Sequence, residues 1–148
     1  MRLLLLASGL LCASTAFNAA YACTCPPFES AAEQAEKYDL IFLGTATGSN
    51  NVTPPIERSP DQAPPPPSPE LYETSFDVTR VLKGEKMTSV VISHTAPSPM
   101  SCGVQYPTDE PLFILASGSK EKGYSTWFCS NAQFSVDVFD AALNTAED

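Results

Sequence analysis

Two cysteines separated by a single residue, Cys23-Thr24-Cys25, are the part of this chain best suited to chemistry. Two further cysteines stand far along the chain, at Cys102 and Cys129, whereas the fifth, Cys12, lies in the expected signal segment before Cys23. Cysteines this close could bond each other only in a strained ring, so each is expected to form a disulfide with a distant partner. Two pairings meet that condition. A zinc site of four thiolates is the alternative, although the spacing lacks a second close pair.

The residues before Cys23 have the pattern of a secretory signal. A basic residue and an apolar run occupy residues 2–11, and Ala20-Tyr21-Ala22 forms a small-x-small cleavage motif directly before Cys23. We therefore expect residues 1–22 to be a cleaved signal peptide and residues 23–148 to form one domain. The protein is expected to be secreted, into the periplasm or the extracellular space, where disulfides persist.

Cleavage before Cys23 would expose a free α-amine on a residue held by a disulfide. Pro26 and Pro27 follow and stiffen the chain. The amine and the carbonyl of one residue can form a five-membered chelate ring on a metal ion with an open coordination position, such as the catalytic zinc of a protease. The alternatives are that the disulfides only fasten a fraying end, or that Cys23 carries a lipid, for which Ala20-Tyr21-Ala22 is a poor motif.

Other residue types that support catalysis are sparse. The single histidine, His94, cannot supply an HExxH metal motif, and it is interpreted as a surface or hydrogen-bonded residue of a strand. No GxSxG motif and no phosphate-binding loop is present. Paired carboxylates at Asp109-Glu110 and at Asp137 with Asp140 are interpreted as solvated charges. The sequence predicts that the protein is not an enzyme and carries no cofactor and no metal of its own.

Composition limits the partners. The chain has 148 residues, a formal net charge of -9 and a pI near 4.4, so nucleic acids and anionic membrane surfaces would repel it. With 43% hydrophobic and 17% charged residues it has enough apolar side chains for one folded core. After the signal no apolar stretch approaches the length of a transmembrane helix. The composition leaves the oligomeric state open.

The elements that must position the cysteines follow from local patterns. Ser30 and Glu33 are spaced as a capping box, which predicts a short helix within residues 29–37. Apolar runs and alternating patterns predict strands at residues 39–47, 71–83, 88–95, 111–117 and 124–129, with a closing helix at 136–143. Five short strands joined by turns indicate an all-β fold, a small antiparallel five-stranded barrel of the OB-fold type with short flanking helices.

A proline-rich loop interrupts this pattern at about residues 48–70. More than half of the fourteen prolines of the chain lie in it, and it is expected to contain neither strand nor helix. The run Pro64 to Pro67 is typical of extended polyproline, which serves as a spacer more often than as a ligand for a proline-binding partner. Asn51-Val52-Thr53 is a glycosylation acceptor in a cell that modifies such sequons.

A series of landmarks, in order along the chain, resembles the N-terminal inhibitory domain of the tissue inhibitors of metalloproteinases and, more broadly, the netrin-like modules. They are Cys23-Thr24-Cys25 with Pro26-Pro27, Asp39-Leu40-Ile41-Phe42, Phe76-Asp77-Val78, Val81-Leu82-Lys83-Gly84, Ser101-Cys102-Gly103, Phe113-Ile114-Leu115-Ala116 and Thr126-Trp127-Phe128-Cys129-Ser130. The cysteine motifs are the specific part of this resemblance.

The resemblance implies disulfides between Cys23 and Cys102 and between Cys25 and Cys129. It also implies that the amine and carbonyl of Cys23 chelate the zinc of a target metalloproteinase. Thr24 is implied to enter the specificity pocket of the protease. Cys25, Pro26 and Pro27 are implied to lie along its cleft, and Met100 and Ser101 to contact the opposite side of that cleft. The alternative is a netrin-like binding or adhesion module without inhibitory activity, which needs no free amine.

Overall fold

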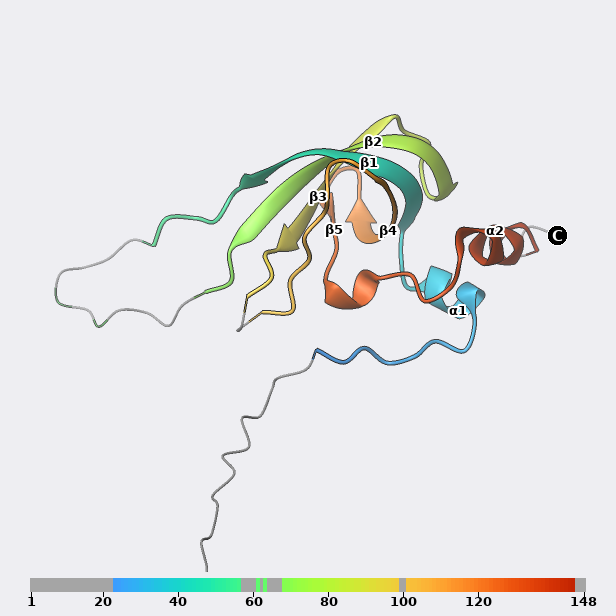
Figure 1. The fold of residues 1–148 in the computed structure, drawn as a ribbon, viewed down its shortest axis with the longest axis horizontal. Helices are drawn as coiled ribbons and strands as arrows, with labels where there is room; N and C mark the ends of the chain where they lie inside the picture. The colour runs from blue at the N-terminus through green and yellow to red at the C-terminus, as the bar shows by residue number, and fades with distance from the viewer. Residues whose placement is uncertain (1–22, 57–60, 62, 64–67, 99–100, 146–148) are drawn as a thin grey trace, which may run out of the picture.

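Five β-strands close into a barrel in the computed structural model, which describes residues 23–56, 61, 63, 68–98 and 101–145 (Figure 1). The strands are β1 (Leu40–Asn51), β2 (Leu71–Lys83), β3 (Ser89–Thr95), β4 (Pro111–Ser119) and β5 (Gly123–Ser125). Around the ring their order is β1-β2-β3-β5-β4, and β4 pairs with β1 to close it. The predicted five-stranded all-β barrel with short flanking helices is confirmed. The expected signal peptide and the run Pro64 to Pro67 lie outside the described residues.

One pair of neighbouring strands is parallel, so the expectation of a wholly antiparallel barrel was wrong. β3 and β5 run in the same direction, with Ile92 opposite Tyr124 and Ser93 opposite Ser125. All other neighbours in the ring are antiparallel. A closed ring with an odd number of strands cannot alternate direction at every step, so one parallel pair is unavoidable.

β1 is longer than predicted and enters the segment that was expected to contain no strand. Its last residues pair with the start of β2, and Asn51 lies opposite Tyr72. Beyond this point Val52 donates a 2.9 Å hydrogen bond to the carbonyl of Leu71. Residues 48–51 of β1 carry no apolar side chain and are held by main-chain hydrogen bonds to β2, which is why the hydrophobic pattern did not reveal this part of the strand. In Figure 1 these paired ends project from the barrel as an arm.

β5 is shorter than the predicted strand at residues 124–129. The chain leaves the sheet after Ser125 and forms a 3₁₀ turn at Phe128–Ser130. The backbone N–H of Ser130 donates to the carbonyl of Trp127 at 2.9 Å, and the Ser130 hydroxyl accepts from the Trp127 N–H at 3.2 Å. These two bonds close the turn and set the position of Cys129 within it.

Two buried clusters lie on opposite sides of β1 and β4. Leu40 and Phe42 point into the barrel, where the Phe42 ring meets Phe76 edge-on at 5.6 Å between centroids. Ile41 and Leu115 point outward and are covered by the helices. Because both faces of these strands are buried, their sequences are continuous apolar runs rather than alternating ones.

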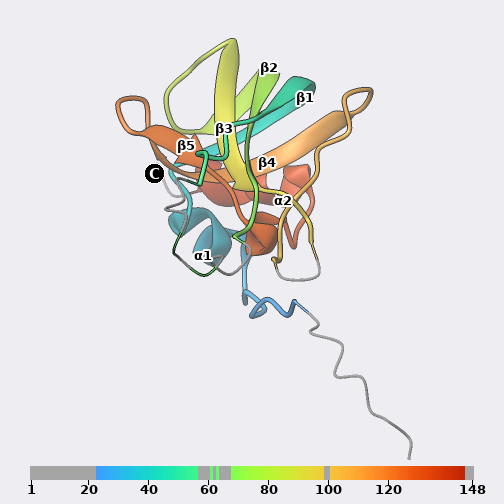
Figure 2. The same cartoon turned by 90° about the vertical axis from the view of Figure 1, so that its left-hand side faces the viewer.

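The two helices cover one side of the barrel wall; in the view of Figure 2, α1 lies below the strands and α2 behind them. α1 (Ala31–Glu36) begins at Ser30, whose hydroxyl accepts from the Glu33 N–H at 3.1 Å. The Glu33 carboxylate reaches the N–H of Glu29 rather than that of Ser30, so the predicted capping box is displaced by one residue. α2 (Val136–Asn144) buries Phe139 against the same wall.

Candidate functional site

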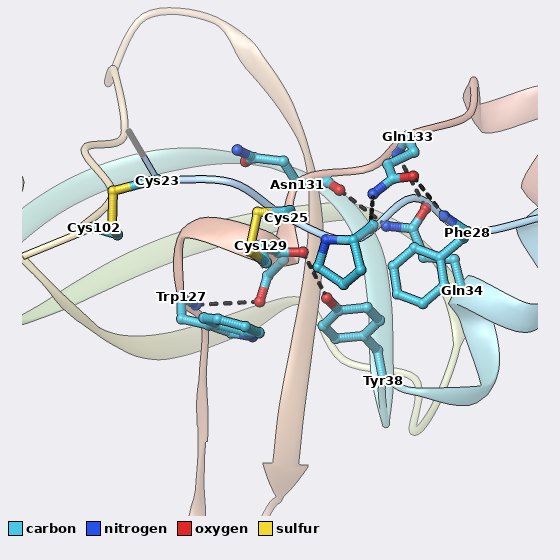
Figure 3. Close-up of a disulfide and its surroundings, with 12 residues drawn as sticks. Cys23, Cys25, Phe28, Gln34, Tyr38, Cys102, Trp127, Cys129, Asn131 and Gln133 are labelled. Atoms are coloured by element: carbon cyan, nitrogen blue, oxygen red, sulfur yellow. Dashed lines mark hydrogen bonds between the residues drawn. A yellow bond between two sulfur atoms is a disulfide. The ribbon is translucent and has the colours of Figure 1, made fainter. Parts of the chain in front are cut away.

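The residues from Cys23 to Phe28, which we call the N-terminal ridge, lie without regular secondary structure and reach the barrel through two disulfides (Figure 3). Cys23 bonds Cys102, with 5.9 Å between the Cα atoms, and Cys25 bonds Cys129, with 5.4 Å. This is the pairing that the family resemblance implied. Each of the four sulfur atoms is bonded to another, so the four-thiolate zinc alternative is overturned.

A side-chain amide holds the ridge beyond the second disulfide. Nε2 of Gln133 donates to the carbonyl of Pro26 at 3.0 Å, and Oε1 of Gln133 accepts from the N–H of Phe28 at 2.9 Å. Figure 3 shows both bonds on one side of the ridge. The Gln133 side chain thus makes the two main-chain hydrogen bonds, to residues two positions apart, that a neighbouring β-strand would otherwise make with the ridge. The ridge is thereby kept extended without being part of the sheet.

Gln34 of α1 fixes the segment that carries Gln133. Its side chain is fully buried; Nε2 donates to the carbonyl of Asn131 at 2.9 Å, and Oε1 accepts from the N–H of Gln133 at 3.0 Å. A buried amide is costly unless its groups are hydrogen-bonded, and here both ends are. The helix thus determines where residues 131–133 lie, and these residues determine where the ridge lies.

Tyr38 supports the second disulfide from below. Its hydroxyl donates to the carbonyl of Cys129 at 2.9 Å, a bond drawn in Figure 3. Burial raises the pKa of the Tyr38 phenol above 10.0, and a hydrogen bond with the Ser130 side chain partly offsets that rise. The phenol therefore stays protonated at neutral pH and remains a hydrogen-bond donor.

The outer side of the ridge faces solvent. Thr24, Pro26 and Pro27 are exposed, while Cys23 and Cys25 are half-buried. A hollow of about 340 Å³ lies between Cys23–Cys25 and the segment 128–133. The arrangement leaves an extended, disulfide-bonded segment with accessible side chains, which is the shape of a peptide laid into the cleft of another protein.

The loop after β3 brings Ser101 next to the ridge. The Ser101 hydroxyl donates to the carbonyl of Ala96 at 2.5 Å, and Val104 donates to the carbonyl of Thr95 at 2.9 Å. Between these contacts the loop lies so close to β3 that a Cβ on Gly103 would stand 2.1 Å from the carbonyl carbon of Ala96. A glycine is therefore required directly after Cys102. Met100, the other predicted contact in this loop, lies outside the described residues.

Sequence patterns missed three residues of this site. Trp127 was taken as a strand residue, but 59% of its surface is exposed, and it directly precedes the turn Phe128–Ser130 that contains Cys129. Gln34 and Gln133 carried no motif. The one available signal was Gln34 on the apolar face that α1 makes with Ala31 and Ala35, where a polar residue needs a partner.

The remaining candidates do not assemble a catalytic group. The interpretation of His94 as a hydrogen-bonded strand residue is confirmed, since Nε2 bonds the Thr74 hydroxyl at 2.7 Å and Nδ1 lies 3.4 Å from the carbonyl of Thr95. Asp140 is not simply solvated, because it pairs with Arg80 at 2.6 Å on the surface. Across the described ranges no set of three or more His, Cys, Asp or Glu side chains could hold a metal ion.

Among the same residues, no helix is both long and apolar enough to cross a membrane. A scan against protein-family models and a search of curated proteins find no match to the chain. The functional assignment therefore depends on the residues of the ridge and on the contacts that hold them.

Proposed function

We propose that the N-terminal ridge is an inhibitory wedge for a zinc metalloproteinase and that the protein acts on that protease in an exported compartment. One observation carries this proposal. Two disulfides and the amide of Gln133 hold Cys23–Phe28 extended, with the outer side chains accessible. A segment ordered before it binds loses little conformational entropy on entering a cleft, so a short contact can bind tightly.

In the proposed complex the first residue supplies the metal contact. With Cys23 as the N-terminal residue, its α-amine and carbonyl oxygen chelate the zinc of the protease and displace the water that would attack a substrate. Thr24 enters the adjacent specificity pocket. Pro26 and Pro27 continue along the cleft, and the Pro26 carbonyl remains bonded to Gln133 of the inhibitor.

The opposite side of the cleft would meet the loop after β3. The disulfide between Cys23 and Cys102 fixes this loop to the chelating residue, and Ser101 is tied back to Ala96. Met100 and Ser101 contact the protease there, while Cys25 lies along the cleft with Pro26 and Pro27. Trp127 adds an apolar contact at the rim.

The test compares two proteins that differ only before Cys23: one begins at Cys23, and the other carries one additional alanine. The addition converts the α-amine into an amide, which cannot chelate zinc, and leaves every contact described above unchanged. We expect the first protein to inhibit members of a metalloproteinase panel and the second to be weaker by at least about 100-fold. Both must retain two disulfides and the same circular dichroism. Equal inhibition by the two proteins, or none by either, would overturn the proposal.

A non-inhibitory netrin-like binding module is the second candidate. The observation in its favour is a set of exposed apolar side chains at and just beyond the paired ends of β1 and β2, namely Val52, Ile56 and Leu71, each more than 40% accessible. Such a module needs no free amine. Binding of a protein partner by both forms, with no inhibition by either, would favour it.

A further inference from the structure

A pocket unrelated to the ridge lies where the arm leaves the barrel. Its volume is about 490 Å³, within the range of roughly 300 to 1,000 Å³ typical of small-molecule sites. Ser49 of β1, Tyr72 of β2 and His94 of β3 contribute to it, and the loop that follows β3 closes it with Gln105 and Tyr106. Nothing in the proposed inhibitory mechanism uses this pocket.

Aromatic rings form much of its wall. The Tyr72 and His94 rings are stacked with centroids 6.1 Å apart, and Tyr106 meets His94 edge-on at 5.0 Å. The imidazole is fixed through its bond to Thr74, which is itself fully buried. The Tyr106 hydroxyl bonds Thr126, and burial raises the pKa of Tyr106, partly offset by that bond. The rings are therefore held in place before any ligand binds.

The pocket contains a carboxylate. Glu70 supplies a carboxylate, and among the described residues that line the pocket none is a lysine or arginine. The Tyr72 hydroxyl donates to Oε2 of Glu70 at 3.2 Å, which places the carboxylate beside the aromatic wall. The chain as a whole has a net charge of -9, which adds to the negative potential. An anionic ligand would meet this carboxylate and would find no lysine or arginine among these residues.

We propose that this pocket binds a small organic cation, a guanidinium or alkylammonium group, with Glu70 as its counter-charge and the rings of Tyr72 and Tyr106 as its walls. A cation within about 6 Å of an aromatic centroid is attracted by the ring, and the attraction increases as water is removed. Ser49, Gln105 and Thr108 also line the pocket, and their hydroxyl and amide oxygens can accept hydrogen bonds from the N–H groups of such a ligand. The cation can belong to an arginine side chain or to a free amine.

The test is an NMR titration of the full folded protein with Nα-acetyl-arginine amide and, as the matched neutral probe, Nα-acetyl-citrulline amide. Citrulline has the shape of arginine without its charge. We expect the arginine probe to shift the amide resonances of Tyr72, His94 and Gln105 and to bind about tenfold more tightly than the citrulline probe. Putrescine is titrated in a second experiment. Its affinity relative to that of the arginine probe distinguishes a free amine from a guanidinium ligand.

Two variants connect binding to the pocket. Glu70→Gln is expected to weaken the arginine probe by about tenfold. Glu73→Gln removes the same charge from the exposed side of β2, does not line the pocket, and is expected to change binding less than about twofold. The proposal would be overturned if the citrulline probe bound as tightly as the arginine probe or if the two variants had equal effects. It would also be overturned if maltose, a neutral sugar, saturated the pocket and the cations did not. Because the ridge is not involved, the added alanine before Cys23 should leave this binding unchanged.

Discussion

The N–H of Gln133 donates a 3.0 Å hydrogen bond to Oε1 of Gln34, a residue 99 positions earlier in the chain. Gln34 is buried in the first helix, whereas Gln133 is exposed and bonds the ridge. Through these bonds Gln34 fixes Gln133, and Gln133 in turn fixes the main chain at Pro26 and Phe28. The contacts that determine the geometry of the ridge therefore come from side chains outside it.

Gln133→Ala is expected to loosen the ridge while the barrel remains folded. The variant loses one bond to Pro26 and one to Phe28, with a cost of about 1 kcal/mol in the free energy of unfolding. Hydrogen exchange at the Phe28 amide should accelerate, and inhibition should weaken several-fold. Asn50→Ala, at an exposed strand position, is the control. An unchanged exchange rate at Phe28 would contradict the assigned role of Gln133.

Gly103→Ala should destabilise the protein by more than about 2 kcal/mol. The added Cβ would lie 2.1 Å from both the carbonyl carbon and the oxygen of Ala96, so the loop must move away from β3. Gly48→Ala is the matched control, since its added Cβ has no atom within 4 Å. Denaturant unfolding of both variants measures the difference. Similar free energies of unfolding would show that the loop does not need this close approach.

Trp127→Ala is expected to preserve stability and to weaken protease binding by about tenfold. The side chain is 59% exposed, so its removal takes little surface out of the core. Val138→Ala removes another exposed apolar side chain, on α2, and serves as the control. Trp127 is the single tryptophan of the chain, so a fluorinated tryptophan gives one ¹⁹F NMR signal, which should shift on complex formation. A signal that stays unchanged in a formed complex would exclude this rim contact.

Alkaline pH should destabilise the fold through Tyr38. Its pKa is raised above 10.0 by burial, so its contribution to stability is present below that pH and is lost as the pH rises through the raised value. Tyr38→Phe should lower stability at neutral pH by about 1 kcal/mol, through the lost bond to Cys129, and should reduce the decline between about pH 9 and about pH 11. Denaturant unfolding at each pH measures both effects. An unchanged alkaline decline would contradict this assignment, and Tyr106, whose pKa burial also raises, should account for part of the remaining decline.

Local physical chemistry was enough to predict most elements. The alternation over residues 71–83 marked β2 at its observed bounds, and Ser30 marked the start of the first helix, because strand periodicity and capping depend on residues close in sequence. The same reasoning failed at residues 48–51 and 126–129. Main-chain pairing with a distant strand extends β1 in the first case, and a disulfide and a tight turn end β5 in the second.

By itself, the sequence determined five strands, two helices and, after the expected signal segment that contains Cys12, four cysteines that must pair across long distances. Only the tertiary structure decided the rest. From the residues alone two disulfide pairings remained, and closure of the barrel places Cys102 at Cys23 and Cys129 at Cys25. Closure also forces β3 and β5 to be parallel, because an odd ring cannot alternate throughout. The positions of Gln34 and Gln133 relative to the ridge follow from the same cause, since contacts between residues about a hundred positions apart exist only once the whole ring has formed.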